Sequence, residues 1–353
     1  MNYPVSPARL TWGLTIATKD RIEELCICVE KALEQTRPVH EIIVVDASKA
    51  WEDNAARVRS IVGSQTSLIY VPADLPSLPE QRNQAVALAQ SDIVFMIDDD
   101  SFMFSDCAEK IMEVYEADID SKIAGVQATL SSDMPGEVNL FAAQAEAKSG
   151  EIMRKNNFRW IMRTIFLMGS EKIFIPYNRS YPDHSIPDAV KVFDIRPERL
   201  FHGARMTFRR EVIRGVKFES LLRFYAPFED LDASHRASHH GALVAVENAY
   251  LYHHMSTTNR MKRFSLTWLS MLNHAVLLKR HSSDISDVKR RYFVLMVRRV
   301  VAEFLKDLLT RRFDFPQCRG ALKAWWDSRK VFSMDMASLE AWYPGYQEKI
   351  IRS

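Results

Sequence analysis

The sequence has few cysteines, no secretion signal and no long apolar run. Its four cysteines, in 353 residues, have neither the spacing of a zinc site nor that of a disulfide framework, so we interpret them as reduced thiols. The amino terminus lacks the charged and then apolar segments of a secretory signal. No stretch approaches the about 18 apolar residues of a membrane span. We therefore expect a cytoplasmic protein, and peripheral attachment at the inner face of a membrane remains an open alternative.

Short apolar runs alternate with helical patterns in the first 130 residues. The spacing predicts helices over 22–33 and 79–90 and strands over 11–18, 41–46, 68–71 and 93–97. Strands that alternate with helices imply an α/β fold with a mostly parallel sheet and right-handed crossovers. The carboxyl ends of such strands share one rim of the sheet, which is where these folds bind ligands.

Three consecutive aspartates, Asp98, Asp99 and Asp100, follow the last of these strands. Alternation along the chain can direct Asp98 and Asp100 one way and Asp99 the other. Carboxylates this close repel one another unless a cation neutralises them, and a hard divalent ion prefers oxygen ligands. The run favours a divalent metal site that carries a phosphorylated substrate. An acidic loop that caps the next helix is the alternative.

Seven segments resemble, in order, the motifs of family 2 glycosyltransferases. They are Ala17–Arg21, Ile42–Ser48, Gln81–Asn83, Asp98–Asp100, Gly203–Arg210, Phe228–Asp232 and Tyr252–His254. The resemblance covers roughly residues 11 to 255. It implies a GT-A, Rossmann-like fold with a mixed, mostly parallel sheet flanked by helices, and an inverting, metal-dependent transferase. The sequence departs from the family pattern at Asp46-Ala47-Ser48, where a second Asp and a Gly are commoner.

The resemblance also implies roles for ten residues. A nucleoside-diphosphate sugar donor would be held by Thr18, Asp20, Asp46, Arg82, Asp98 and Asp99. Asp100 and His253 would bind the divalent cation, Mn²⁺ or Mg²⁺, and an imidazole suits Mn²⁺ better. Asp230 would be the general base, because a free sugar hydroxyl is a poor nucleophile. Glu229 would position Asp230 or the acceptor.

Structural interpretations compete with the roles of four of these residues. Arg82 is suited equally to an ion pair with Asp98 or Asp99. His253 would otherwise be a half-buried polar residue at a strand end. Glu229 and Asp230 suit the first turn of a helix that runs to His240, with Gly241 at its end.

Other functions would require other motifs. The Gly-Lys-Ser/Thr of P-loop phosphotransferases does not occur. A sugar nucleotidyltransferase would carry a Gly-rich loop after its first strand, and a phosphatase of the haloacid dehalogenase kind would carry its paired Asp there; neither occurs at 18–21. The nucleotidyltransferase remains an alternative, as does an inactive glycosyltransferase-like scaffold for polysaccharide assembly. The acceptor, a glycan or a lipid-linked saccharide, would meet residues 137–200.

We divide the chain at residues 130 and 256. Residues 1–130 would bind the nucleotide sugar, 131–256 would bind the acceptor, with a long loop or lid at 176–197, and 257–353 would form a helical extension. Residues 260–312 hold 13 Lys or Arg against four Asp or Glu, a net +9, so the remainder carries −7 within the total of +2.

Two amphipathic helical patterns occupy this basic stretch. Their apolar faces are predicted at Phe264, Trp268, Met271, Leu272, Ala275 and Leu278, and at Phe293, Met296, Val297, Val300, Val301, Phe304 and Leu308. One interpretation is a helical cap whose apolar faces pack on the core and whose cations are solvated. The other is attachment to an anionic membrane surface, where lipid-linked acceptors reside. No nucleic-acid recognition motif accompanies the charge, so we expect no nucleic-acid partner.

Overall fold

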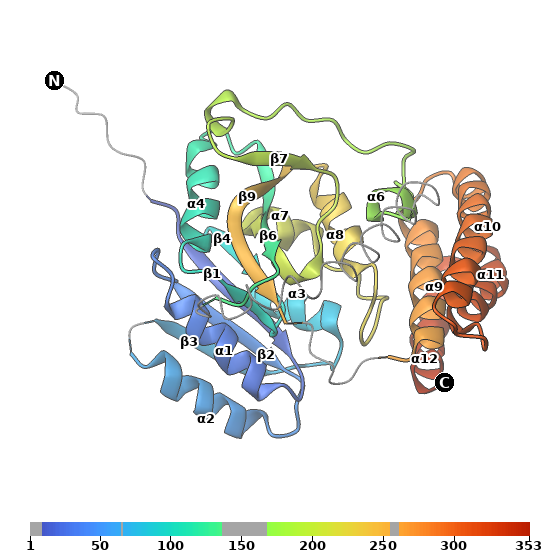
Figure 1. Ribbon diagram of the computed structural model, residues 1–353, viewed down its shortest axis with the longest axis horizontal. Helices are drawn as coiled ribbons and strands as arrows, with labels where there is room; N and C mark the ends of the chain where they lie inside the picture. Colours follow the sequence, from blue (N-terminus) through green and yellow to red (C-terminus); the bar gives the residue numbers. More distant parts are fainter. Residues whose placement is uncertain (1–8, 65, 136–167, 255–260) are drawn as a thin grey trace. The chain divides into compact units, whose positions relative to one another are not determined.

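A computed structural model describes residues 9–64, 66–135, 168–254 and 261–353 (Figure 1). They belong to two compact units. The first unit takes its described residues from 1–135, 182–218 and 233–256, and the second from 136–181, 219–232 and 257–353. The boundaries predicted at residues 130 and 256 divide the chain by donor and acceptor binding, which this division into compact units does not test. They stay predictions.

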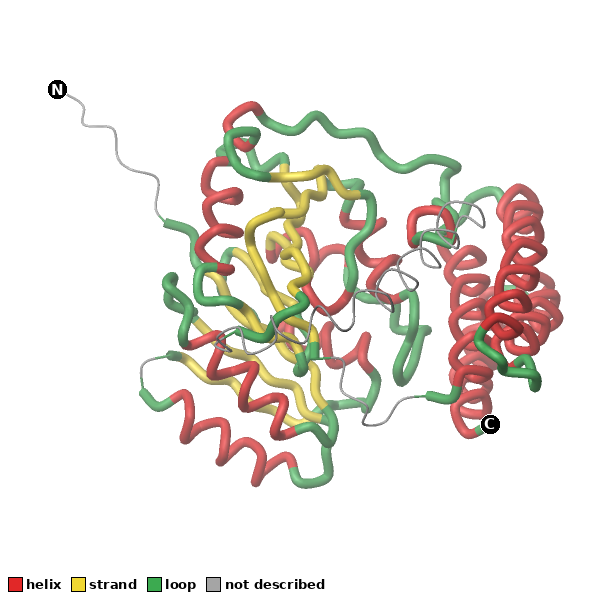
Figure 2. The backbone as a smooth tube through the Cα atoms, viewed as in Figure 1, coloured by secondary structure: helices red, strands yellow, loops and turns green. Residues whose placement is uncertain are grey.

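A mixed, mostly parallel sheet is the centre of the first unit (Figure 2). Within the described residues its order is β3-β2-β1-β4-β8-β6-β9-β5, and β7 pairs with β9. β1 to β4 are parallel, β8 is antiparallel to both its neighbours, and β6 and β9 run parallel. The strands are β1 (Trp12–Thr18), β2 (Glu41–Asp46), β3 (Ser67–Pro72), β4 (Ile93–Met96), β5 (Ser101–Met103), β6 (Ile123–Ser131), β7 (Ile195–Glu198), β8 (Met206–Arg209) and β9 (Ala242–His253).

Helices cover both faces of this sheet. β2 shows why: Ile42 and Val44 enter one apolar cluster, and Ile43 and Val45 enter the other, so neither face is left to water. Each such fully buried side chain stabilises the fold by roughly 1.5–3 kcal/mol. One cluster is shared with α1 (Ile22–Leu33), α2 (Trp51–Val62) and α4 (Cys107–Ala117), the other with α3 (Leu78–Leu88) and α7 (Arg210–Val216). The predicted α/β fold and its first four strands are confirmed.

Two predictions for residues 176–240 were wrong in detail. The segment 176–197 is not loop throughout, because η1 (Asp188–Val190) interrupts it and β7 adds antiparallel to β9. The helix predicted to reach His240 is α8 (Glu229–Ala237), which ends three residues earlier. The amides of His239 and His240 bond to the carbonyls three residues back, and this tight turn leads into β9.

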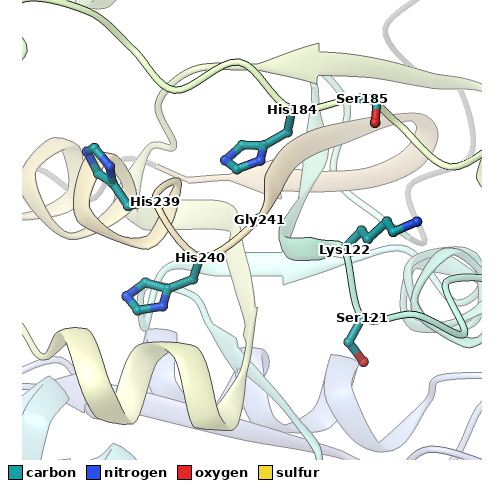
Figure 3. A pocket seen from close by; sticks show the side chains of 7 residues that line it. All are labelled: Ser121, Lys122, His184, Ser185, His239, His240 and Gly241. Carbon is teal, nitrogen blue, oxygen red and sulfur yellow. The ribbon is translucent and has the colours of Figure 1, made fainter.

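A shallow pocket of about 250 Å³ lies at the start of β9. Figure 3 shows its lining residues Ser121, Lys122, His184, Ser185, His239, His240 and Gly241. A Cβ at Gly241 would lie 2.5 Å from the carbonyl oxygen of Lys122, so only glycine allows this close approach of the two chains. None of the ten predicted site residues lines this pocket.

The described part of the second unit is mainly helical. The predicted helical extension is confirmed as α9 (Arg263–His281), α10 (Ile285–Leu309), α11 (Pro316–Ser333) and α12 (Met336–Arg352), preceded by the short α6 (Ser170–Ile173). The carboxylates of Asp284 and Asp335 accept backbone N–H bonds and so cap α10 and α12. The apolar face predicted for α9 is largely buried. Over the residues described, no helix is both long enough and apolar enough to span a bilayer.

For α10, the interpretation in which the apolar stripe packs on the core is wrong. Its apolar stripe faces outward: Phe293 is 52% exposed and Phe304 42%. Its inner face is largely apolar but also holds buried polar groups: the Arg299 guanidinium pairs at 2.6 Å with Glu303, which is 1% exposed. A carboxylate oxygen of the buried Asp307 also accepts the first N–H groups of α11, at 2.9 and 3.0 Å. These contacts keep Glu303 and Asp307 on the inner side of α10. The sequence pattern of one helix cannot show them.

All four cysteines are free and buried. Burial raises the pKa of each thiol, that of Cys107 to about 12, so the thiolate is disfavoured. The interpretation of the cysteines as reduced thiols is confirmed.

Candidate functional site

The acidic run after β4 is distributed over two sets of partners in the first unit. Asp99 accepts hydrogen bonds from the Thr18 hydroxyl (2.7 Å) and the Arg21 guanidinium (3.0 Å). Asp98 pairs with Arg82 at 2.8 Å, and a carboxylate oxygen of Asp100 lies 3.1 Å from Nε2 of His253. His253 lies near Asp98 (3.9 Å) and Asp100 (3.1 Å), as the predicted alternation implies, but the two sets of partners overlap, because Arg21 also lies 3.7 Å from Asp100.

Burial perturbs the carboxyl group of Asp99. It is 4% exposed, and this burial is the main reason that its pKa is raised, to about 7. Arg21 and the Thr18 hydroxyl oppose the rise but do not cancel it. A cation held beside Asp99 would favour the charged carboxylate.

Strand pairing places His253 beside Asp100. β5 follows the acidic run directly and pairs antiparallel with β9, with Ser101 opposite His253. The amide of His254 donates to the carbonyl oxygen of Asp100 at 2.9 Å, which ties the two segments together. His253 therefore faces the carboxylates, and His254 is exposed.

Asp98, Asp100 and His253 offer ligand atoms that lie within 4.8 Å of one another. In the part of the chain that the structure describes, this is the one such group of His, Cys, Asp or Glu. Two ligand atoms that bind one ion, each at about 2.1–2.3 Å, lie about 3 Å from each other. The 3.1 Å between the Asp100 carboxylate oxygen and Nε2 of His253 agrees with this spacing. Two carboxylates and an imidazole suit Mn²⁺, so the residues present fit a divalent ion.

The end of β2 is organised around Asp46, which is 1% exposed. Its carboxylate accepts bonds from the Ser48 amide (2.7 Å), the Asn54 side chain (2.9 Å) and the Tyr70 hydroxyl (2.6 Å). The Ser48 hydroxyl in turn accepts the amide of Asp20, which has φ +55°. Three protein donors already surround Asp46, so its role in donor binding stays a prediction.

Helix α3 links the ends of the strands. The Gln81 side chain donates to the carbonyl oxygens of Thr18 and Val45, both at 2.9 Å, and so joins β1 to β2. Arg82, besides its pair with Asp98, donates to the Gly203 carbonyl and lies over the Phe218 ring. The ion-pair interpretation of Arg82 is therefore observed, and contact with the donor remains a prediction.

Three residues of this site were not assigned a role from the sequence: Arg21, Gln81 and Tyr70. Arg21 and Gln81 lie inside segments that carried the family resemblance, so their position was a usable signal. Tyr70 had no such signal, because it reaches Asp46 only through the pairing of β2 with β3.

Glu229 and Asp230 lie in the second unit, at the start of α8. Glu229 is buried and Asp230 is half-buried. The segment before them has three non-glycine residues in the left-handed region: Phe224 (φ +61°), Ala226 (φ +41°) and Phe228 (φ +81°). Such residues cost on the order of 1–3 kcal/mol each and persist only where the surrounding structure holds them.

The helical extension supplies the groups that hold this strained segment. The Asn273 side chain of α9 donates to the Pro227 carbonyl at 2.8 Å, and the neutral His274 ring stacks on Phe228 with centroids 4.8 Å apart. Burial lowers the pKa of His274 to about 3, so the ring is uncharged. The Gln347 side chain of α12 donates to the Leu221 carbonyl and accepts a hydrogen bond from the Arg223 amide.

A buried polar group lies next to the same segment. Nε2 of His281 is 3.0 Å from a carboxylate oxygen of Glu219 and 3.6 Å from Asp232, and Asp232 also accepts the Tyr177 hydroxyl at 2.6 Å. Burial alone would raise the pKa of Glu219, but the hydrogen bonds from His281 and the Leu221 amide lower it to about 2. The ionised Glu219 therefore stabilises this unit.

Replacing Glu219 with glutamine is expected to lower the free energy of unfolding at neutral pH, by no more than about 3 kcal/mol. The pKa of Glu219 is lower in the folded than in the unfolded chain, so its contribution is present above about pH 4.5 and is lost as the pH falls toward 2. The difference between the two proteins should accordingly shrink below about pH 4.5. Denaturant titrations followed by tryptophan fluorescence at several pH values measure it; a difference independent of pH would contradict the assignment.

Comparison with known proteins defines the class. Residues 14–186 match the family model described as glycosyl transferase family 2, so the chain carries a domain of this family. Among curated protein sequences, none matches this chain.

Among solved structures, GalNAc-T7 with UDP, GalNAc and Mn²⁺ has a TM-score of 0.54 at 11% identity, over 96% of this chain and 59% of that one. The mannosyltransferase PcManGT of Pyrobaculum calidifontis, in complex with GDP-Man and Mn²⁺, has a TM-score of 0.48 at 12% identity, over 99% and 86% of the two chains. TarS 1–349 of S. aureus has 0.47 at 13%, over 97% and 89%. Residues 14–186 are therefore a glycosyltransferase family 2 domain, and the fold is of the GT-A kind.

Proposed function

We propose that this chain transfers a sugar from a nucleoside-diphosphate sugar to a hydroxyl group of a glycan or lipid-linked acceptor, with inversion at the anomeric carbon. The observation that carries the proposal is the convergence of Asp98, Asp100 and His253 at the carboxyl rim of the parallel strands; the two aspartates lie within residues 14–186, which match the family 2 model. Open α/β sheets bind their ligands at such a rim. Hexosyl or deoxyhexosyl transfer is the class we expect.

Asp100 and His253 would hold a divalent cation, with Mn²⁺ favoured by the imidazole ligand. When bound, such an ion neutralises the negative charge on the departing nucleoside diphosphate. The protein keeps the ligands in place through the β5–β9 pairing and the amide bond to Asp100.

The remaining residues of the first unit would bind the donor. Thr18, Asp20 and Asp46 would meet the base and ribose, and Asp98 or Asp99 the ribose. Arg82 holds Asp98 in its present orientation and would add positive charge near the diphosphate. Because Asp46 and Asp99 already accept several hydrogen bonds, their main contribution would be a rigid, pre-organised wall of the site.

Asp230 would remove the proton of the acceptor hydroxyl as that oxygen attacks. Attack from the face opposite the leaving diphosphate would invert the anomeric centre. Glu229 would position Asp230 or the acceptor. The support for both roles is the match to the family motif and the strained segment before them, since strain of this kind clusters at functional sites.

Thermal unfolding with nucleoside diphosphates tests the proposal. UDP, GDP and dTDP are each added with Mn²⁺, with Mg²⁺ or with chelator. A ligand at 100 times its dissociation constant adds about 2.7 kcal/mol to the stability, so one nucleotide with metal should raise the melting temperature clearly and chelator should remove the rise. Hydrolysis of the matching sugar nucleotide separates an active enzyme from an inactive scaffold. No shift with any nucleotide and metal would contradict the proposal.

A further inference from the structure

Helix α10 presents an apolar stripe to solvent. Six side chains on it are between 41% and 59% exposed: Phe293, Val294, Val297, Val301, Phe304 and Leu308. Their spacing of one, three, four, three and four residues places them on one face of the helix, in an arc of about 100°. Isolated exposed apolar residues are ordinary, but a continuous row of this kind marks an interaction surface.

The exposure of the stripe is not the result of loose packing of α10. The opposite face of α10 is firmly held, because Asp307 accepts the first amides of α11 and the Tyr292 hydroxyl donates to the Met271 carbonyl of α9 at 2.8 Å. Turning the stripe inward would break these bonds and expose the buried Arg299–Glu303 pair. The apolar face therefore stays outward in this unit and is available to a partner.

The exposed charge on residues 285–330 is mainly positive, and Asp314 is the one exposed acidic residue among them. Residues 285–330 hold five acidic residues, and four of them, Asp287, Glu303, Asp307 and Asp327, have side chains no more than 9% exposed. Exposed cations remain on α10, its following turn and α11: Lys289, Arg290, Arg311, Arg319, Arg329 and Lys330. The α11 residue Trp326 is 65% exposed, with the Arg329 guanidinium 4.6 Å from its ring centroid.

We propose that the outward face of α10, with Trp326 of α11, docks into the interface of an anionic lipid bilayer. The stripe would enter the boundary between headgroups and acyl chains, and the exposed cations would lie against lipid phosphates. A second copy of the chain fits this face less well, because two identical stripes would bring like-charged rims together. The proposal concerns where the enzyme works and is independent of the proposed reaction.

The proposal also changes the expected chemistry of attachment. From the sequence we would neutralise Arg290, Arg291, Arg298 and Arg299 to weaken membrane binding. All four have partners: Arg290 pairs with Asp287, Arg291 donates to the Pro176 carbonyl, Arg298 donates to the Lys172 carbonyl, and Arg299 pairs with Glu303. Of the four, Arg290 is the one largely exposed, at 78% of its side chain. Apolar contact should therefore carry most of the affinity.

Vesicle co-sedimentation of the full chain tests the inference. The variant Val297→Gln with Val301→Gln makes the centre of the stripe polar without adding charge. The matched control, Ile119→Gln with Val192→Gln, changes two residues of the first unit that are 84% and 80% exposed. On vesicles that contain phosphatidylglycerol, we expect the stripe variant to partition at least about tenfold more weakly than wild type, and the control to bind like wild type. Added salt should reduce wild-type binding in part and not abolish it.

Three further measurements keep the test decisive. The stripe variant should keep the wild-type melting temperature, since its substituted side chains face solvent; a clear fall would show that other parts of the chain cover the stripe and would overturn the proposal. A dimer of the wild type that the variant dissociates, in sedimentation velocity, would assign the face to a second copy instead. Wild type that binds no anionic vesicles at low salt would also overturn it. Donor hydrolysis without lipid should be unchanged in both variants. A failure of the membrane-docking proposal would therefore leave the proposed reaction standing.

Discussion

Asp100→Ala is expected to abolish metal-dependent turnover of the sugar nucleotide, with a loss on the order of 10³-fold, because charge neutralisation by a bound ion is worth several kcal/mol in such reactions. Asp100 is 3% exposed and is the carboxylate closest to His253, so the substitution removes a ligand that no neighbour replaces in the same position. The thermal shift with nucleotide and Mn²⁺ should vanish in the same variant. Steady-state hydrolysis at increasing Mn²⁺ measures the first effect.

The variant is expected to fold without metal. Removing one of three adjacent carboxylates relieves repulsion, so the melting temperature in chelator should not fall greatly. Asp120→Ala is a suitable control, because Asp120 is 69% exposed and pairs only at the surface with Lys122. Wild-type protein that is fully active in excess chelator would refute the metal site, as would an Asp100→Ala enzyme that still responds to Mn²⁺.

Asp230→Asn is expected to lower turnover by about 10²-fold or more, the usual scale for a lost general base. Nucleotide affinity should barely change, because Asp230 would act on the acceptor and lies in the other unit from the donor-binding residues. The amide keeps the size of the side chain, so the melting temperature should be close to that of wild type. Single-turnover transfer to an acceptor, beside the thermal shift with nucleotide, separates the two effects.

The competing role for Asp230 gives the opposite result. An acid that only favours the first turn of α8 would affect stability by a few tenths to about 1 kcal/mol and leave turnover intact. Glu229→Gln provides the comparison, with a milder loss or a weaker acceptor affinity. If Asp230→Asn lost nucleotide binding and kept its turnover, the assignment of the base would be wrong.

The first unit shows how far local pattern reaches. Runs such as Ile42–Val45 are buried on both faces. Their strand character, their order along the chain and the acidic residues at their ends could therefore be predicted without knowing which strands pair. Alternation along β9 let one of His253 and His254 face the site, and the pairing of β5 with β9 places His253 there. What the pattern could not supply was the partner of each side chain: that Tyr70 reaches Asp46, or that Gln81 joins β1 to β2, depends on which strands and helices become neighbours.

The sequence by itself determined the α/β fold, the helical extension, the acidic strand end and the family, because each rests on residues close together in the chain or on motifs in a set order. Only the tertiary structure decided the orientation of α10 and the support of the strained segment before Glu229. The periodicity of α10 marks an apolar face but not its direction, and that direction follows from hydrogen bonds between Asp307 and α11. Likewise, Asn273 and His274 hold Pro227 and Phe228 across more than 40 residues of chain, a contact that no local pattern encodes.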